Sequence, residues 1–186
     1  MLIFISQNCI AFIGILIVLT IFIFRILIMN LNVQKTISDK YKFEFMKLLF
    51  GIYGVLLISR VFFPITIGID DSLSFNSPEI WLSPIWSIKQ YFINGGFYWM
   101  IYMIVGNFLL LLPLGFFVGY FKDSKYKRVK EALIFCFKAS LFIETSQLLI
   151  SILIPNTVRF FEINDIILNT IGGGVGFYIH SKFKNK

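Results

Sequence analysis

Long apolar stretches alternate with short polar ones along the whole chain. Five of these stretches have the composition of membrane-spanning helices, because about 20 mostly apolar residues are enough to cross the hydrocarbon core of a bilayer. They cover about residues 9–29, 48–67, 97–121, 132–154 and 163–179, and the last is the shortest. The sequence therefore predicts an all-α integral membrane protein, a bundle of about five transmembrane helices.

The overall composition agrees with this pattern. Of the 186 residues, 58% are hydrophobic and only 15% are charged, and the mean hydropathy is +0.82. Such a chain leaves almost no polar sequence for a soluble domain, so we expect residues 1–186 to form a single polytopic membrane domain. No Lys or Arg precedes the first apolar stretch and no A-x-A pattern follows it, so we expect a retained membrane helix rather than a secretory signal.

Basic residues gather in alternate connections between the expected spans. The connections after the first and third spans and the C-terminal tail are rich in Lys and Arg, whereas the other two connections hold only Lys89 and Arg159. The basic residues of the rich segments are Lys35, Lys40, Lys42, Lys47, Lys122, Lys125, Lys127, Arg128, Lys130, Lys182, Lys184 and Lys186. Lys and Arg accumulate on the cytoplasmic side of membrane proteins. The N-terminus is therefore expected outside and the C-terminus inside, in a bacterial cytoplasmic membrane.

The net charge of +7 follows from the same bias. Basic loops on the cytoplasmic side are attracted to anionic lipid head groups, so membrane lipids are the expected partners and nucleic acid is not. Cys9, Cys136 and the single His180 stand far apart without metal-ligand spacing. We therefore expect no disulfide, no metal and no cofactor.

The connection between the second and third spans is the longest, at about residues 68–96. It carries Trp81, Trp86 and Tyr91 among apolar residues, which is typical of a segment lying in the membrane interface. A flap over a site on the outer side is the alternative. The run Asn94-Gly95-Gly96 then indicates a turn at which the chain re-enters the membrane.

Several ionisable residues fall inside the expected spans. Arg25 and Lys138 lie near cytoplasmic ends, where long side chains reach water, and no role is assigned to them. Arg60 lies roughly 10 Å and Glu144 roughly 15 Å below the outer ends of their spans, at 1.5 Å per residue. Charged residues at such depth usually face the bundle interior. We predict that Arg60 pairs with Glu144, or with Asp165 if the second helix packs against the fifth.

Three expected spans each carry a polar stripe at helical spacing. The stripes comprise Asn107, Gly115 and Gly119 in the third span, Ser140, Glu144, Gln147 and Ser151 in the fourth, and Asp165, Asn169, Gly172, Gly173, Gly176 and His180 in the fifth. Packing the three stripes together places their polar groups in the outer half of the bundle, around an outward-opening cavity. Pro113 is expected to bend the third helix.

Each of these residues taken singly has a structural interpretation. The glycines favour close helix packing, and Asn107 is typical of a hydrogen bond between helices. Asp165 suits a helix N-cap, and Glu144 suits an ion pair with Arg60. Two carboxylates, one or two arginines, two amides and a Gln in one region nevertheless exceed what packing requires.

The polar positions together resemble the VanZ-like family of bacterial membrane proteins. The resemblance covers about residues 97–180 and rests on three motifs: Asn107 followed by Pro113-Leu114-Gly115, Glu144-x-x-Gln147, and Arg159 followed by Asp165-x-x-x-Asn169 with Gly172 and Gly173. The family takes its name from a protein linked to resistance against the lipoglycopeptide teicoplanin. The resemblance implies importance for Asn107, Glu144, Gln147, Arg159, Asp165 and Asn169, and physical reasoning alone adds Arg60.

Three functional hypotheses follow, in this order. The first is a cell-envelope protein that binds or remodels an outer-leaflet amphiphile, such as a lipid head group, a lipid-linked wall precursor or a lipoglycopeptide. The second is an intramembrane enzyme with Glu144 as acid and Asp165 as base, and with Arg60 or Arg159 holding a phosphate or carboxylate. No Ser or Cys nucleophile paired with a base supports it. The third is a transporter, which would have to oligomerise because the chain has no inverted repeat.

Overall fold

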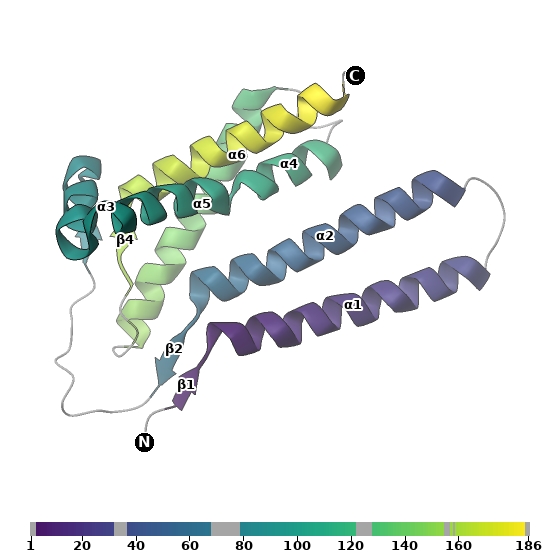
Figure 1. Cartoon of the computed structure of the whole chain (residues 1–186), viewed down its shortest axis with the longest axis horizontal. Coiled ribbons are helices and arrows are strands. Elements are labelled where there is room, and N and C mark those ends of the chain that lie inside the picture. The colour runs from purple at the N-terminus through teal and green to yellow at the C-terminus, as the bar shows by residue number, and fades with distance from the viewer. Residues whose placement is uncertain are drawn as a thin grey trace. The chain divides into compact units, whose positions relative to one another are not determined.

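The chain is helical through most of its length. The computed structural model describes residues 3–31, 37–67, 79–121, 128–154, 157 and 159–184. Figure 1 shows the helices α1 (Gln7–Leu31), α2 (Ile37–Phe62), α3 (Pro84–Leu110), α4 (Leu112–Phe121), α5 (Val129–Leu153) and α6 (Ile163–Lys184). The strands are short: β1 (Ile3–Ile5), β2 (Ile65–Ile67), β3 (Ile80–Trp81) and β4 (Phe161–Glu162).

Four helical segments of the described residues are long and apolar enough to cross a membrane. They are Gln7–Ile28, Lys40–Phe62, Pro84–Phe121 and Val129–Leu153, and they confirm four of the expected spans as helices of membrane type. The fifth expected span is also helical, in α6, but its Asn, Asp, His and glycine residues lower its hydropathy. A crossing by α6, and with it the total of five spans, stays a prediction.

The chain divides into two compact units, Met1–Asp70 and Asp71–Lys186, which are described separately. The expectation of one membrane domain stays a prediction. In the first unit α1 and α2 run antiparallel, and β1 pairs antiparallel with β2 at one end of the hairpin (Figure 1). Gly14 lies against Val55 and Gly51 against Val18, so the missing side chains let the two helices approach closely.

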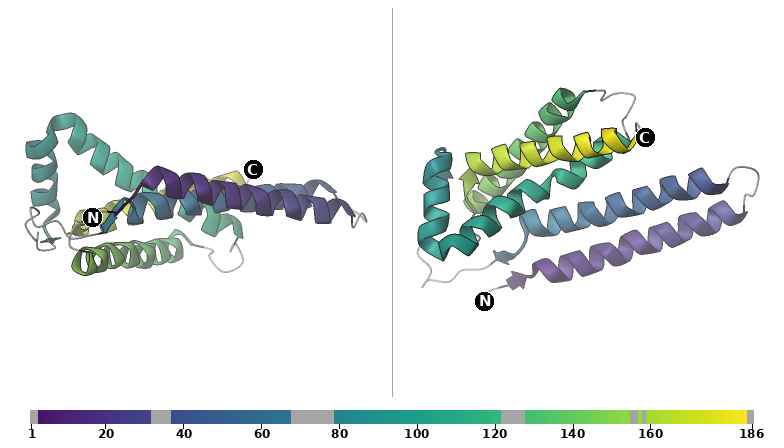
Figure 2. Two further views of the ribbon diagram at one scale, coloured as in Figure 1. Left: turned by 90° about the horizontal axis from the view of Figure 1, so that it is seen from below. Right: turned by 45° about the horizontal axis from the view of Figure 1, so that its top comes forward.

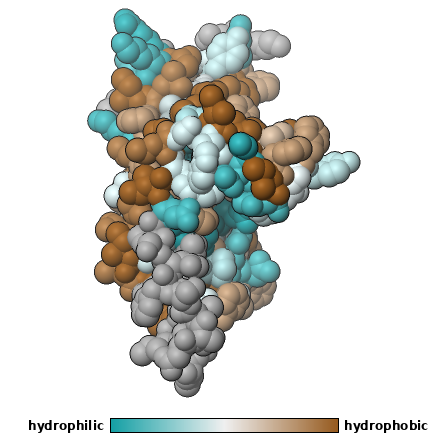
Figure 3. Space-filling view, turned by 90° about the vertical axis from the view of Figure 1, so that its left-hand side faces the viewer, coloured by the Kyte–Doolittle hydropathy of each residue, from teal (hydrophilic) through white to brown (hydrophobic). Residues whose placement is uncertain are grey.

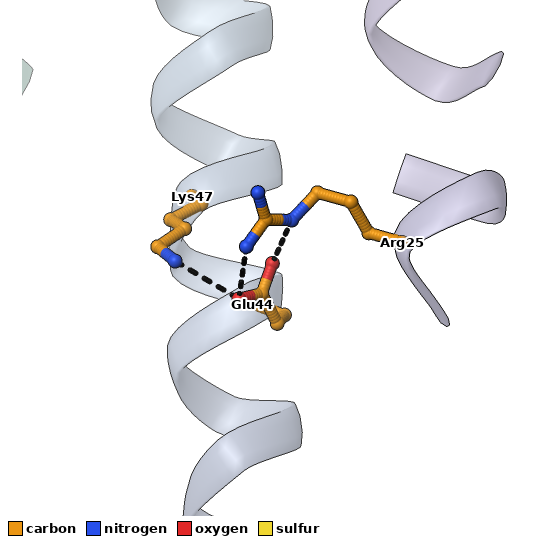
Figure 4. Close-up of polar contacts among 3 residues, drawn as sticks. All are labelled: Arg25, Glu44 and Lys47. Atoms are coloured by element: carbon orange, nitrogen blue, oxygen red, sulfur yellow. Dashed lines mark hydrogen bonds and ion pairs between the residues drawn. The ribbon is translucent and has the colours of Figure 1, made fainter. Parts of the chain in front are cut away.

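A buried carboxylate ties α1 to α2. Figure 4 shows Arg25 reaching from α1 to Glu44 on α2, with Arg25 Nε 2.7 Å from Glu44 Oε2 and Arg25 Nη2 2.8 Å from Glu44 Oε1. Lys47 Nζ donates to the same carboxylate at 2.9 Å. The sequence gives Arg25 no role beyond reaching water, and this is wrong. Glu44 escapes notice because the second span is expected from about residue 48, whereas α2 begins at Ile37.

In the second unit α6 packs against α3, α4 and α5 (Figures 1 and 2). A methyl group added to Gly172 would meet the Phe108 carbonyl oxygen, one on Gly176 the Leu112 carbonyl oxygen, and one on Gly115 the Gly173 backbone. These contacts of helix backbone on helix backbone confirm the close packing predicted from the glycine spacing. Val118, Ala132 and Phe177 form a buried apolar core beside them.

Two breaks divide the helical stretch from Pro84 to Phe121. Gly96 has φ +73°, a left-handed conformation that glycine adopts without strain, and Figure 2 shows the two arms of α3 meeting there at a steep angle. The turn expected at Asn94-Gly95-Gly96 is thereby confirmed. The second break, at Leu111, comes two residues before Pro113, which has no N–H to continue the hydrogen-bond ladder.

The first arm of α3 is held near the start of α6 by a parallel strand pair. In β3 and β4, Ile80 faces Phe161 and Trp81 faces Glu162. Phe161 N also donates to the Glu79 carbonyl oxygen at 3.1 Å. The long connection before α3 and the segment after α5 are therefore joined immediately outside the first turn of α6.

We expect the end of the second unit that carries β3 and β4 to face outward and the end of α6 to face the cytoplasm. Lys35, Lys122, Lys125, Lys127 and Lys186, on which the orientation partly rests, lie outside the described residues. Leu82 is 67% exposed and Phe183 is 72% exposed, so the described protein covers neither side chain. An impermeant maleimide added to intact cells should label Leu82→Cys and not Phe183→Cys, because Lys and Arg mark the cytoplasmic side.

The labelling background replaces only the exposed Cys9, by serine, since Cys136 is buried. Labelling of Phe183→Cys from outside, with Leu82→Cys protected until the cells are opened, would reverse the orientation and place the polar end of the unit in the cytoplasm.

Candidate functional site

Three carboxylates meet where α6 begins. Glu144 comes from α5, Glu162 from β4 and Asp165 from the first turn of α6, and we call them the acidic cluster. Glu144 is 2% and Glu162 is 5% exposed, and the Glu162 N–H donates to Glu144 Oε2 at 3.1 Å. Asp165 lies within electrostatic reach of both glutamates. α6 begins at Ile163, so Asp165 is not the N-cap residue that its sequence position allowed.

Both arms of α3 supply hydrogen-bond donors to the acidic cluster. From the first arm, the Tyr91 hydroxyl donates to Glu162 Oε2 and lies 3.5 Å from Asp165 Oδ1. From the second arm, Asn107 Nδ2 donates to Asp165 Oδ1. Ser87, fully buried on the first arm, lies beside the Glu162 carboxylate. The break at Gly96 therefore lets one helix approach the cluster from two directions.

Buried amides extend the polar region. One turn along α6 from Asp165, Asn169 Nδ2 donates to Ser140 Oγ at 2.9 Å, and Asn169 is 1% exposed. Asn164 is 4% exposed and lies beside Tyr91. Among the described residues, Asn169 Oδ1 and Asn164 Nδ2 have no hydrogen-bond partner. Buried polar atoms are nearly always paired, so these two atoms are hydrogen-bonding groups of the polar region that the described protein does not satisfy.

Burial and like charge act together on the cluster. Burial raises the pKa of Glu162, which lies outside the spanning helices, while hydrogen bonds from Tyr91 and Ser87 act in the opposite direction. Carboxylates this close repel one another, so full ionisation of all three is unfavourable unless a cation joins them. The site can therefore exchange a proton or accept a positive group.

An aromatic group, consisting of Trp81, Trp86 and Phe160, flanks the acidic cluster. Trp81 stacks on Phe160 with ring centroids 4.9 Å apart and meets Trp86 edge-on at 4.7 Å. Trp81 is the strand partner of Glu162, which places the rings beside the cluster. Figure 3 views the chain from this side and shows hydrophilic and hydrophobic residues interspersed on its surface.

The structure separates the aromatic residues that the sequence treats as one interfacial set. Trp86 is 43% exposed, as expected for an interface, but Tyr91 is only 4% exposed. Its hydroxyl points into the acidic cluster instead of toward head groups. Tyr91 therefore faces the protein interior, because the helical turn from Ser87 to Tyr91 puts both residues on the face toward β4. The depth of this segment in the membrane stays a prediction.

The structure brings together four of the seven residues selected from sequence. Asn107, Glu144 and Asp165 meet in the cluster, and Asn169 lies next to it. Arg159 is half-buried, and its backbone N–H and carbonyl both hydrogen-bond with Ser151 Oγ. Gln147 is half-buried on α5. The place of both side chains in the site stays a prediction. Arg60 belongs to the first unit, so its pairing with Glu144 or Asp165 also stays a prediction.

Sequence reasoning missed four residues of the site: Ser87, Tyr91, Glu162 and Asn164. A signal for Glu162 exists, since Arg159, Glu162 and Asp165 recur every three residues. For Ser87 and Tyr91 the sequence gives none, because their position depends on the strand pair and on the break at Gly96.

Comparison with known proteins agrees with these motifs. The family model described as VanZ/LLP1 matches residues 50–184 of the chain. The match begins within α2 and reaches the end of α6, so it is wider than the motif region of about residues 97–180. No curated protein and no solved structure matches the chain.

Proposed function

The chain belongs to the VanZ-like family, and we propose that it is a bacterial cytoplasmic-membrane protein that binds or remodels an outer-leaflet amphiphile at the acidic cluster. The observation that carries the proposal is the meeting of buried Glu144 and Glu162 with the half-buried Asp165, next to amide atoms without partners. The amphiphile's head group would complete this incomplete polar site. Its apolar part would lie against the lipid-facing helices.

A purely structural role fits these residues less well. Each ionisable side chain in a membrane bundle is costly, and well-packed apolar residues of similar volume are often as stabilising as a buried polar network. The donors from Tyr91 and Asn107 also leave acceptor capacity on all three carboxylates, since each oxygen accepts more than one hydrogen bond. Such spare capacity supports recognition of a ligand.

The glycine contacts favour a site open to one side of the membrane. Beyond the acidic cluster, Gly172 and Gly176 press against the backbones of α3 and α4, and Gly115 presses against Gly173. These contacts close α6 onto its neighbours between the cluster and the C-terminal end. They support binding or remodelling at one leaflet over transport through a single chain.

An intramembrane acid–base enzyme is the second candidate. Glu144 and Asp165 fall in one cluster, as two carboxylates that divide acid and base work must. Tyr91 adds a proton donor next to them. The enzyme and the binder differ in one readout: after incubation with outer-leaflet lipids, the enzyme releases an altered lipid, whereas the binder returns its amphiphile unchanged.

We expect Glu144→Gln to lose the bound amphiphile while the protein still folds. The amide keeps the size of the side chain but removes its charge. A hydrogen bond to a charged group contributes about 1.5–3 kcal/mol, so the affinity for the amphiphile should fall by roughly tenfold or more. Native mass spectrometry of protein purified in mild detergent measures the lipid that remains bound. Susceptibility to teicoplanin of cells expressing each protein gives a second readout, in which Glu144→Gln should lose any protection that the wild type confers.

Glu131→Gln is the matched control. Glu131 lies on the same helix and belongs to a capping box with Arg128, which Gln also completes. It should therefore retain wild-type lipid. Equal lipid occupancy in Glu144→Gln and Glu131→Gln would exclude a binding role for the Glu144 charge.

A further inference from the structure

We infer that the head group bound at the acidic cluster carries a protonated amine. The inference rests on the proposed function and specifies the chemistry of its ligand. It concerns the amine itself, whether a lipid head group or a wall-precursor or lipoglycopeptide side chain presents it.

The hydrogen-bonding inventory of the site requires donors. Glu144, Glu162 and Asp165 supply only acceptors when ionised, and Asn169 Oδ1 is a further buried acceptor without a donor among the described residues. An ammonium group offers three donors and no acceptor, so it complements this set. A phosphate or carboxylate oxygen would add acceptors to a site that already has an excess.

The negative charge of the acidic cluster also favours a protonated amine as the ligand group. Three neighbouring carboxylates in a membrane protein repel one another, and a positive group among them relieves that repulsion. An anionic group placed there would increase it.

The surroundings of the cluster also suit an ammonium ion. Trp81 is the strand partner of Glu162 and stacks on Phe160, so an aromatic pair lies near the acidic cluster. Aromatic faces next to acidic groups attract ammonium ions by cation–π interaction.

Two pairs of probes test the inference on the wild-type protein. The lipid pair is phosphatidylethanolamine and its N-acetyl derivative; the peptide-like pair is lauroyl-lysine amide and its Nε-acetyl derivative. Acetylation removes the positive charge and two of the three donors, and it adds an acetyl group with one carbonyl acceptor. We expect the free amine of at least one pair to bind at least tenfold more tightly in a native mass spectrometry titration, since one charge-assisted hydrogen bond contributes about 1.5–3 kcal/mol. The pair that discriminates identifies the source of the amine.

Asp165→Asn should reduce that discrimination, and Glu131→Gln should leave it unchanged. Equal binding of amine and acetylated probe in both pairs, or tighter binding of phosphatidylglycerol or of Ca²⁺ alone, would overturn the inference. In those cases the proposed function would still stand if binding of some probe is weakened by Glu144→Gln. If Glu144→Gln binds every probe as tightly as the wild type does, the proposed function itself would be contradicted.

Discussion

Gly176→Leu is expected to abolish assembly of the folded protein. Gly176 is buried in α6, and even a methyl group there would meet the carbonyl oxygen of Leu112 and the backbone N of Phe116. Backbone atoms cannot move aside as a flexible side chain can, so α6 and α4 would have to separate. Overpacking a tight contact costs typically 1–3 kcal/mol and occasionally more, and here it also displaces the helix that carries Asp165.

The yield of monodisperse protein in detergent, followed by size-exclusion chromatography, measures this effect. Val175→Leu is the matched control, because Val175 is the preceding residue and is 36% exposed. It should give wild-type yield. Normal yield and melting temperature for Gly176→Leu would mean that α6 and α4 do not pack through their backbones.

Asn107→Leu should lower the stability of the second unit by about 1–3 kcal/mol. The substitution removes the donor that Asn107 Nδ2 provides to Asp165 Oδ1, and leaves a half-buried carboxylate short of a partner. Asp165→Leu alone should be costly for the converse reason. Replacing both residues by leucine should be milder than the sum of the two single changes, because apolar groups then face one another.

Melting temperatures of the four proteins in one detergent complete this double-mutant cycle. A coupling of 0.5–3 kcal/mol is the usual range for residues in contact. Additive effects of the two substitutions would show that Asn107 and Asp165 act independently and would remove the second arm of α3 from the site.

The helices and the convergence of their polar stripes could be predicted from sequence. In a membrane, backbone groups are satisfied within each helix, so apolar length and helical periodicity are reliable signals. Asn107, Glu144 and Asp165 stand on such stripes, and the glycine spacing of α6 shows which face packs closely. The structure joins the stripes through Asn107 with Asp165, and through Asn169 with Ser140.

The rest depends on contacts that no local pattern shows. Glu162 enters the cluster because β4 pairs with β3, a partner about eighty residues earlier in the chain. Tyr91 enters because α3 breaks at Gly96 and folds its first arm back. In the first unit, Arg25 finds Glu44 because α2 begins well before its apolar stretch.

The most direct test of ligand binding at the acidic cluster is a structure determined in lipid nanodiscs at a resolution that shows head groups. We expect head-group density within hydrogen-bonding distance of Glu144 or Asp165, contacting Asn169 Oδ1 or Asn164 Nδ2, with acyl density along the lipid-facing helices. Lipids ordered on the outside of the bundle, together with a cluster whose carboxylates and amides contact only protein and water, would contradict the proposed function.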